Sequence, residues 1–217
     1  SPPPFLCTIV VSTSENHLNR QVELTQYRIV MSDSEKARIV DEAIERIAAN
    51  DPSLTRAHLF EKGIGAAAAC VRIAEALRGN THLTELDLRV NVIGDDGASA
   101  LAEVLKSNTT LIKLSLSYND IGPVGASALA EMLKSNTTLT YLDLNYNDIG
   151  DGGASTLAEA LKSNASLTMF SLHRNSIGDV GASALAEALK YNNTLTGLEL
   201  NGNNDISDDG ASALAGG

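Results

Sequence analysis

The sequence predicts an α/β solenoid, right-handed and curved like a horseshoe, with a parallel sheet on the concave side and helices on the convex side. Leucine, asparagine and glycine recur with one period of 28 residues, as Leu83, Leu111 and Leu139 illustrate. Each period begins with alternating leucines, typical of a strand buried on one face. It continues with an Ala- and Leu-rich phrase of helical spacing. A strand and a helix in every repeat give this architecture.

Three residue columns keep the period along the chain. They are Leu83, Leu111, Leu139, Leu167 and Leu195; Asn91, Asn119, Asn147, Asn175 and Asn203; and Gly94, Gly122, Gly150 and Gly178. An inserted Asn204 shifts the last copy by one residue. In the strand phrase, Leu114 and Leu116 alternate with polar residues. In the helical phrase, Leu101 and Leu105 lie four residues apart among strong helix formers.

The repeated phrase Leu-x-x-Leu-x-Leu-x-x-Asn-x-Ile-Gly-x-x-Gly-Ala-x-x-Leu-Ala-x-x-Leu resembles the ribonuclease-inhibitor-like subclass of leucine-rich repeats. That subclass includes the repeats of NOD-like receptors and of the Ran GTPase-activating protein. The resemblance extends from about Leu54 to the end of the chain. It implies a leucine-rich-repeat solenoid, but scaffold residues of this kind say little about function.

The asparagines and the acidic residues near each helix are expected to serve the scaffold. We expect the asparagine column to hydrogen-bond the backbone bend after each strand as a ladder. Asp95, Asp151, Asp179 and Asp208 stand where a carboxylate can cap a helix N-terminus, and Pro123 fits the first turn of a helix in the remaining copy. A row of calcium ions on these aspartates is the alternative. Because capping explains the aspartates fully, we expect neither a metal site nor a cofactor.

The chain divides into three expected segments. Residues 1–30 do not fit the repeat and are expected to be a poorly ordered or non-native N-terminal segment. Residues 31–53 are expected to hold an N-terminal capping helix over Ser34–Ala49, because Ser32–Glu35 has the form of a capping box. Residues 54–217 form an array of about six repeats, the last of them incomplete. An array that ends within a helix is expected to expose apolar surface, which could support self-association.

Composition narrows the class of partner. The formal net charge is −11, and nucleic acids and anionic membranes bind clustered Lys and Arg instead. No apolar run is long enough for a membrane-spanning helix, and Cys7 and Cys70 are too far apart in the sequence to indicate a disulfide framework. We therefore expect a cytoplasmic protein that binds neither nucleic acid nor membrane.

Nothing in the sequence indicates catalysis, and we expect that the protein is not an enzyme. The four histidines lack metal-ligand spacing, and neither a nucleophile elbow nor a phosphate-binding loop is present. Sequons begin at Asn108, Asn136, Asn164 and Asn192. All four fall at one position of the repeat, the turn from helix to strand, so termination of the helix explains them without a glycan.

The residues between the strand leucines should face the concave surface and carry specificity. Tyr and Arg are enriched at binding hot spots, and two tyrosines and an arginine follow one another in the column before the asparagines. The candidate partner-binding residues are Tyr118, Tyr141, Tyr146, Met169, His173, Arg174, Asp87 and Asp143. The acidic members suit a partner surface that is partly basic.

The predicted function is that of a protein-interaction module within a larger regulatory or sensing protein. One alternative is a GTPase-activating protein, because the resemblance to the Ran regulator implies a functional arginine, for which Arg89 and Arg174 are candidates. A second alternative is cytoskeletal. The phrase Ala49-Asn50-Asp51-Pro52-Ser53-Leu54-Thr55 is similar to the entry of the repeat domain of tropomodulins, which cap actin filaments.

Overall fold

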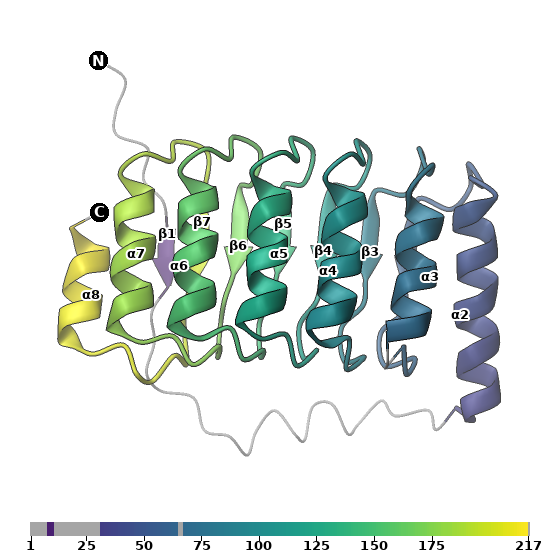
Figure 1. Cartoon of the computed structure of the whole chain (residues 1–217), viewed down its shortest axis with the longest axis horizontal. Helices are drawn as coiled ribbons and strands as arrows, with labels where there is room; N and C mark the ends of the chain where they lie inside the picture. Colours follow the sequence, from purple (N-terminus) through teal and green to yellow (C-terminus); the bar gives the residue numbers. More distant parts are fainter. Residues whose placement is uncertain (1–7, 11–30, 65–66, 217) are drawn as a thin grey trace.

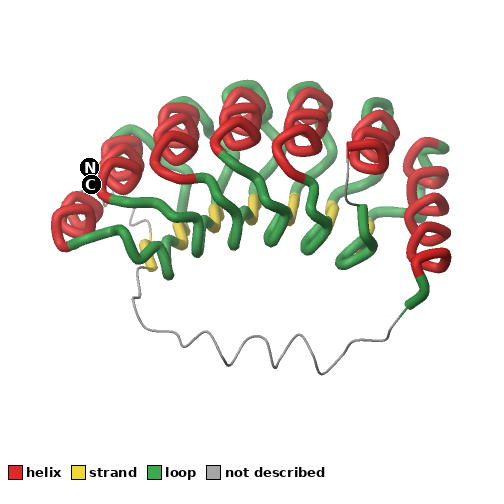
Figure 2. Tube along the Cα trace, turned by 60° about the horizontal axis from the view of Figure 1, so that its bottom comes forward, coloured by secondary structure: helices red, strands yellow, loops and turns green. Residues whose placement is uncertain are grey.

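The computed structural model describes residues 8–10, 31–64 and 67–216. These form an α/β leucine-rich-repeat solenoid with two layers, in which a row of helices covers one face of a parallel sheet (Figures 1 and 2). The strand order is β1-β7-β6-β5-β4-β3-β2. The repeat strands therefore lie in sequence order, as the 28-residue period predicts.

The helices and strands alternate along the array. The strands are β1 (Thr8–Val10), β2 (Arg56–His58), β3 (Glu85–Asp87), β4 (Lys113–Ser115), β5 (Tyr141–Asp143), β6 (Met169–Ser171) and β7 (Gly197–Glu199). The helices are α2 (Asp33–Ala48), α3 (Ala67–Leu77), α4 (Gly94–Leu105), α5 (Pro123–Leu133), α6 (Gly150–Leu161), α7 (Asp179–Leu189) and α8 (Asp208–Ala215). Each helix of the row packs against the next.

The core consists of stacked layers of the strand and helix leucines. Leu86, Leu114 and Leu142 pair in register across three strands and are fully buried. Phe170 takes the equivalent place in β6 and is also fully buried. Because each repeat buries its apolar face only against its neighbours, these layers are the main source of stability.

The asparagine column forms the expected ladder at the bend after each strand. The Asn119 side-chain oxygen accepts hydrogen bonds from the backbone N–H groups of Asn91 (3.0 Å) and Ile93 (3.3 Å). Its amide nitrogen donates to the carbonyls of Leu88 (2.9 Å) and Ser117 (3.1 Å). Each such side chain thus satisfies backbone groups of two repeats, which fixes the offset between successive layers.

A second asparagine ladder lies at the turn from helix to strand. Asn136 donates to the carbonyls of Leu105 (2.7 Å) and Asn108 (3.2 Å), and it accepts from the N–H groups of Thr138 (2.9 Å) and Leu139 (2.8 Å). All sequon asparagines are buried: Asn108, Asn136, Asn164 and Asn192. Their amide nitrogens are used inside the fold, so the sequons are structural.

The helix-capping aspartates act one repeat further along than their sequence position suggests. Asp151 stands in α6, yet its Oδ1 accepts hydrogen bonds from the N–H groups of Gly178 and Gly181 at the start of α7, both at 2.8 Å. Asp95 makes the same pair of bonds with the start of α5, and Asp179 bonds the start of α8. The expectation that each aspartate caps its own helix is therefore wrong, because stacking brings the preceding carboxylate over the free N–H groups.

How a helix begins also depends on which residue holds the capping position in the preceding repeat. Where an aspartate caps from the preceding repeat, Gly122 and Gly178 have extended backbones and the helix starts one residue later. For α6, the equivalent position in the preceding repeat is held by Pro123, which has no carboxylate to cap the helix. There Gly150 adopts φ 60° and already belongs to the helix. Two forms of helix start therefore exist within one repeat consensus.

The segment before the repeats contributes a helix and a strand. Helix α2 lies close to the expected range, with Ser32 accepting a hydrogen bond from Glu35 N–H and with Val40, Ile44 and Ile47 buried against the first repeat. Of the N-terminal 30 residues, the structure describes Thr8–Val10, which pair in parallel with β7. The rest of that segment, with the expectation made for it, lies outside the described residues.

The C-terminal end of the array differs from expectation. Leu198 and Leu200 are fully buried, and Leu214 is 4% exposed. None of the exposed large hydrophobic residues in the described part of the chain lies in this last repeat. Among the described residues of this repeat, the expected exposed apolar surface is limited to alanine side chains, those of Ala211 and Ala215 in α8. Strand β1 occupies the edge of β7 where a further repeat would otherwise continue the sheet.

Candidate protein-binding surface

The column before the asparagine ladder places bulky side chains on a left-handed backbone. Val90, Tyr118, Tyr146 and Arg174 have φ values of 59°, 56°, 54° and 52°. Such values are unusual for large side chains and carry a conformational cost. Glycine occupies the equivalent place only in the last copy, at Gly202 (φ 68°). The chain therefore presents aromatic and cationic groups at positions where the backbone itself favours glycine.

These side chains form one stacked cluster. The rings of Tyr118 and Tyr146 lie parallel, with centroids 4.0 Å apart and 12° between their planes. The guanidinium of Arg174 lies 5.4 Å from the Tyr146 ring centroid, and the ring of His173 meets Tyr146 edge-on at 4.9 Å. We call Tyr118, Tyr146, His173 and Arg174 the tyrosine cluster. The sequence predicted that these residues would gather, and the structure brings them together.

The remaining candidates lie on the neighbouring strands. Tyr141 pairs with Met169 in the register of β5 and β6, and both are half-buried. Burial, followed by the charges of Asp143 and Glu199, raises the pKa of the Tyr141 hydroxyl. This part of the surface continues the tyrosine cluster towards the start of the strands.

Three candidates are less accessible than the sequence predicted. Asp87 is 5% exposed, while Asp143 and His173 are each 7% exposed. The expectation that they are exposed is wrong, because side chains of adjacent strands crowd together on the concave side, where strands lie only about 4.8 Å apart. These residues support their neighbours more than they offer contact area.

The two buried aspartates have opposite electrostatic environments. Burial acts to raise the pKa of Asp87, but hydrogen bonds and the charge of Arg89 outweigh it, and the net shift is downward. The Arg89 guanidinium donates hydrogen bonds to both carboxylate oxygens of Asp87, at 2.9 and 2.7 Å. Burial raises the pKa of Asp143, and the hydrogen bond from Ser117 (2.5 Å) and the more distant Arg89 only partly oppose this. Asn145 holds the position relative to Asp143 that Arg89 holds relative to Asp87, so no arginine pairs with Asp143 from that position.

An open hollow of about 410 Å³ lies beside the tyrosine cluster, on the edge where the strands end. Its lining residues are Tyr118, Tyr146, Asn147, Asp148, Arg174, Ser176, Gly202 and Asn204. The hollow and the cluster together offer a concave contact with aromatic walls and one cation, as expected of an anchoring pocket for a partner side chain.

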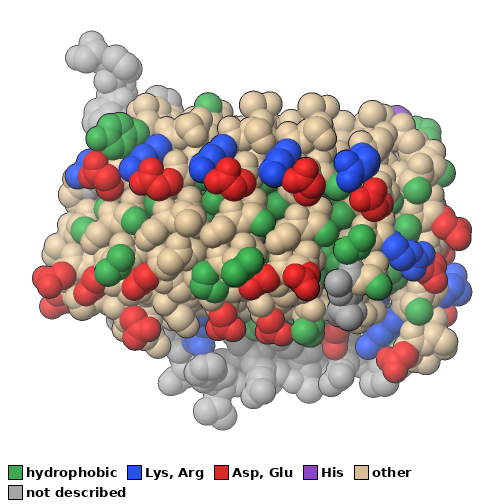
Figure 3. Space-filling view, viewed as in Figure 1, with side chains coloured by type: hydrophobic (Ala, Val, Ile, Leu, Met, Phe, Trp, Pro, Cys, Tyr) green, Lys and Arg blue, Asp and Glu red, His purple; other side chains and the backbone are tan. Residues whose placement is uncertain are grey.

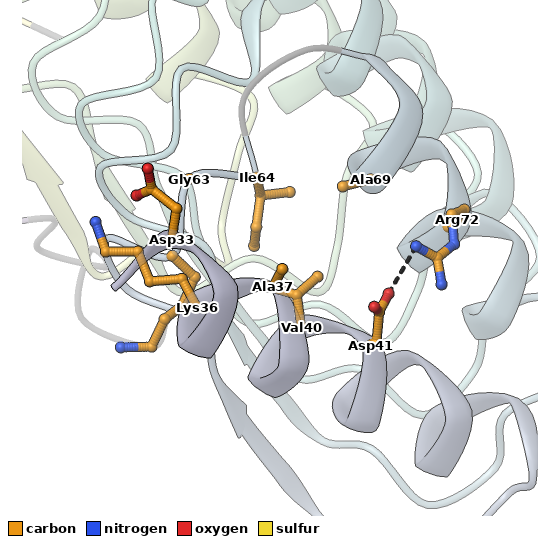
Figure 4. Close-up of a pocket in the computed structure, with 10 residues that line it drawn as sticks. Asp33, Lys36, Ala37, Val40, Asp41, Gly63, Ile64, Ala69 and Arg72 are labelled. Atoms are coloured by element: carbon orange, nitrogen blue, oxygen red, sulfur yellow. Dashed lines mark ion pairs between the residues drawn. The ribbon is translucent and has the colours of Figure 1, made fainter. Parts of the chain in front are cut away.

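A second hollow, of about 310 Å³, lies at the opposite end of the array between α2 and the first repeat (Figure 4). Val40 and Ile64 form its floor, and an ion pair between Asp41 and Arg72 (2.8 Å) crosses its rim. Sequence reasoning did not find it, because it depends on how α2 docks on the first repeat.

The convex face carries a regular pattern of charge. Each of the helices α3 to α7 has a Glu–Lys or Glu–Arg pair at its end, so acidic and basic side chains form parallel rows across these helices (Figure 3). The pairs are Glu75–Arg78, Glu103–Lys106, Glu131–Lys134, Glu159–Lys162 and Glu187–Lys190. Exposed ion pairs of this kind contribute little to stability. The charges within each pair cancel, whereas the acidic side chains in the first turns of α4, α6, α7 and α8 have no such basic row beside them (Figure 3).

Among the described residues, no group of three or more His, Cys, Asp or Glu side chains could hold a metal ion. Cys70 is buried in α3, and burial raises the pKa of its thiol to about 12, so it is unreactive. Within the same part of the chain, no helix has both the length and the apolar character needed to cross a membrane.

Comparison with known proteins identifies the domain. A family model described as "TMOD/LMOD Leucine-rich domain" matches residues 37–147, just over half of the chain. The chain belongs to this family. A second model, described as "Leucine Rich repeat", matches residues 163–186 and 191–215 of the chain. The finer assignment to the ribonuclease-inhibitor-like subclass is not confirmed.

Solved structures agree with this assignment. A structure described as "Leiomodin-1 Actin-Binding Site 2 (ABS2)" is 25% identical, with a TM-score of 0.53, and the match covers 81% of this chain and 87% of that one. A tropomodulin C-terminal domain from Caenorhabditis elegans is 14% identical, with a TM-score of 0.52 and coverages of 81% and 89%, and supports the fold. No curated protein matches the chain. The family model and the match to the leiomodin-1 structure favour the cytoskeletal alternative over the general prediction of an interaction module.

Proposed function

We propose that this TMOD/LMOD leucine-rich domain is an actin-binding module of the cytoskeleton and that it contacts actin through the tyrosine cluster. The match to leiomodin-1 actin-binding site 2 carries the proposal, because it extends over most of both chains. The match of residues 37–147 to the TMOD/LMOD leucine-rich family model supports the same assignment.

The tyrosine cluster is the part of the concave face best suited to binding. Its rings and guanidinium are already held in contact with one another, so little side-chain entropy remains to be lost on association. Tyr and Arg combine apolar area with hydrogen-bonding groups, which is why they recur at hot spots. Within the cluster, His173 is buried and meets the Tyr146 ring edge-on, which helps to fix the position of that ring.

The GTPase-activating alternative has less support. The Arg89 guanidinium is bound by both oxygens of Asp87 and lies 5.5 Å from the ring of Phe60. Release of this arginine towards a nucleotide would break a bidentate pair with a buried carboxylate, which is costly. The cytoskeletal proposal requires no such rearrangement.

Cosedimentation with actin filaments and binding to labelled actin monomers test the proposal together. The Tyr146→Ala/Arg174→Ala double variant is expected to bind at least tenfold more weakly than the unmodified chain. The matched control is Lys190→Ala/Tyr191→Ala, which removes a cation and a 60%-exposed ring from the end of α7. It should bind as the unmodified chain does.

The two outcomes separate the parts of the proposal. If the unmodified chain binds neither filaments nor monomers, actin is not the partner. If it binds actin and both double variants bind equally well, the partner is right and the tyrosine cluster is not the site.

A further inference from the structure

The edge of β7 accepts a strand that belongs to no repeat. Strands β2 to β7 each come from one copy of the repeat, and each is joined to a helix of the convex row. Strand β1 comes from a segment that precedes all the repeats, yet it extends the same sheet beyond β7 (Figure 1). Residues that are far apart in the sequence, Thr8 and Gly197, are thereby paired.

The register of this pairing is that of an additional repeat. Gly197, Leu198 and Glu199 pair with Met169, Phe170 and Ser171 on one side. On the other side, the same three residues pair with Thr8, Ile9 and Val10, again in parallel. The edge of β7 therefore pairs with β1 in the same direction and register as with β6. The 28-residue spacing that aligns successive repeat strands does not connect β1 to β7.

The internal strands show which amides of such a guest strand face β7. In β6, Met169 N–H donates to the Thr140 carbonyl of the preceding turn (3.0 Å), and in β7 Gly197 N–H donates to Thr168 (3.0 Å). Thr8 occupies the same register position, so its amide and, by the alternation of a parallel ladder, that of Val10 are directed to β7. The amide of Ile9 is directed away from it.

The attachment of β1 is limited in extent. The paired segment has three residues, and residues 11–30 link it to the opposite end of the array. Each repeat strand is also fixed by the helix of its own repeat, whereas the next described element after β1 is α2, which belongs to no repeat. Because β1 belongs to the same chain as β7, a free strand has to compete with an intramolecular partner. It can bind when the pairing of β1 with β7 is weakened.

We propose that the outer edge of β7, which β1 occupies in this structure, is a docking site for one extended, β-branched peptide segment in parallel orientation, with Thr8–Val10 as its resident and exchangeable ligand. Recognition rests on main-chain hydrogen bonds, as in other cases of strand addition to a sheet edge. The preference for β-branched residues follows from their fit to a pleated surface. This site lies at the end of the sheet and is independent of the proposed actin contact.

Two proline variants of the full chain distinguish the paired amides from the outward one. Val10→Pro removes an N–H group directed to β7, whereas Ile9→Pro, the matched control, removes one directed away from it. In the internal pattern, Leu172 N–H donates to Glu199 O (2.8 Å); by the same register, Leu200 N–H is directed to Val10. Hydrogen exchange of the Leu200 amide should be at least tenfold faster in Val10→Pro and unchanged in Ile9→Pro. The amides of β4 and β5 should keep their protection in both.

Fluorescence anisotropy with a labelled peptide then tests exchange. The peptide has the sequence of residues 5–12 with serine in place of cysteine. It should bind Val10→Pro at least tenfold more tightly than it binds the unmodified chain or Ile9→Pro. A peptide N-methylated at the valine that corresponds to Val10 should lose this affinity, and one N-methylated at the isoleucine should keep it. Equal binding to all three chains, or indifference to the site of methylation, would overturn the proposal.

Discussion

Because the backbone of Tyr146 is left-handed, we expect Tyr146→Gly to be more stable than Tyr146→Ala, which reverses the usual order of stability. At an ordinary position, alanine is more stable than glycine by about 0.5–1 kcal/mol. Tyr146 has φ 54°, and this region costs a residue with a Cβ atom about 1–2 kcal/mol. Both Tyr146→Gly and Tyr146→Ala lose the ring contacts with Tyr118, His173 and Arg174, so those losses cancel in the comparison. Tyr146→Gly should therefore be the more stable of the two by about 1 kcal/mol.

Urea unfolding followed by circular dichroism measures this difference directly. For a chain of this size, 1 kcal/mol corresponds to about 2–4 °C in Tm, so calorimetry provides a second measurement. The control is Tyr141, which lies in β5 and has no positive φ; there, Tyr141→Ala should be more stable than Tyr141→Gly by about 0.5–1 kcal/mol. If alanine is equal to or better than glycine at both sites, the argument from backbone strain is refuted.

The same pair of variants separates binding from folding. Both remove the Tyr146 ring, so both should lose actin binding to the same degree while their stabilities differ. If both variants lose binding while the glycine variant is the more stable, Tyr146 contributes to the proposed contact at a cost in stability.

Three further predictions concern the scaffold and its electrostatics. Asp151→Ala should lower the free energy of unfolding by about 1 kcal/mol and speed hydrogen exchange at the start of α7, because the carboxylate caps that helix from the preceding repeat. Gly150→Ala should destabilise by about 1–2 kcal/mol through its positive φ, whereas Gly152→Ala, within the same helix and with open space around its Cα, should stabilise by about 0.5–1 kcal/mol; equal denaturation midpoints would contradict this. The pKa of Asp143 is higher in the folded state than in the unfolded state, so this residue stabilises the fold at acidic pH. That stabilisation is lost as the pH rises from the pKa of the unfolded state through the pKa of the folded state. Asn145→Arg should lower the pKa of Asp143, as Arg89 lowers that of Asp87 in β3. NMR titration of the Asp143 carboxyl group measures this change, and an unchanged pKa would refute the analogy.

The tyrosine cluster shows how far sequence reasoning reached at the candidate site. Strand periodicity places Tyr118 and Tyr146 in one column, because parallel strands in register bring equivalent positions together. It could not show that the column has a left-handed backbone, since that depends on the bend imposed by the asparagine ladder. Nor could it show that Asp143 and His173 are covered, because burial depends on the side chains of neighbouring strands.

The sequence by itself determined the repeat, its strand and helix, the leucine core and the asparagine ladder, because each of these depends on residue periodicity within one copy and its neighbour. Only the tertiary structure decided that Asp151 caps the following helix and that Thr8–Val10 pair with the last repeat strand. Both contacts join groups through the stacking of layers or across the whole length of the chain. Local pattern and intrinsic propensity carry no information about contacts of that kind, because these depend on where the layers bring distant residues together.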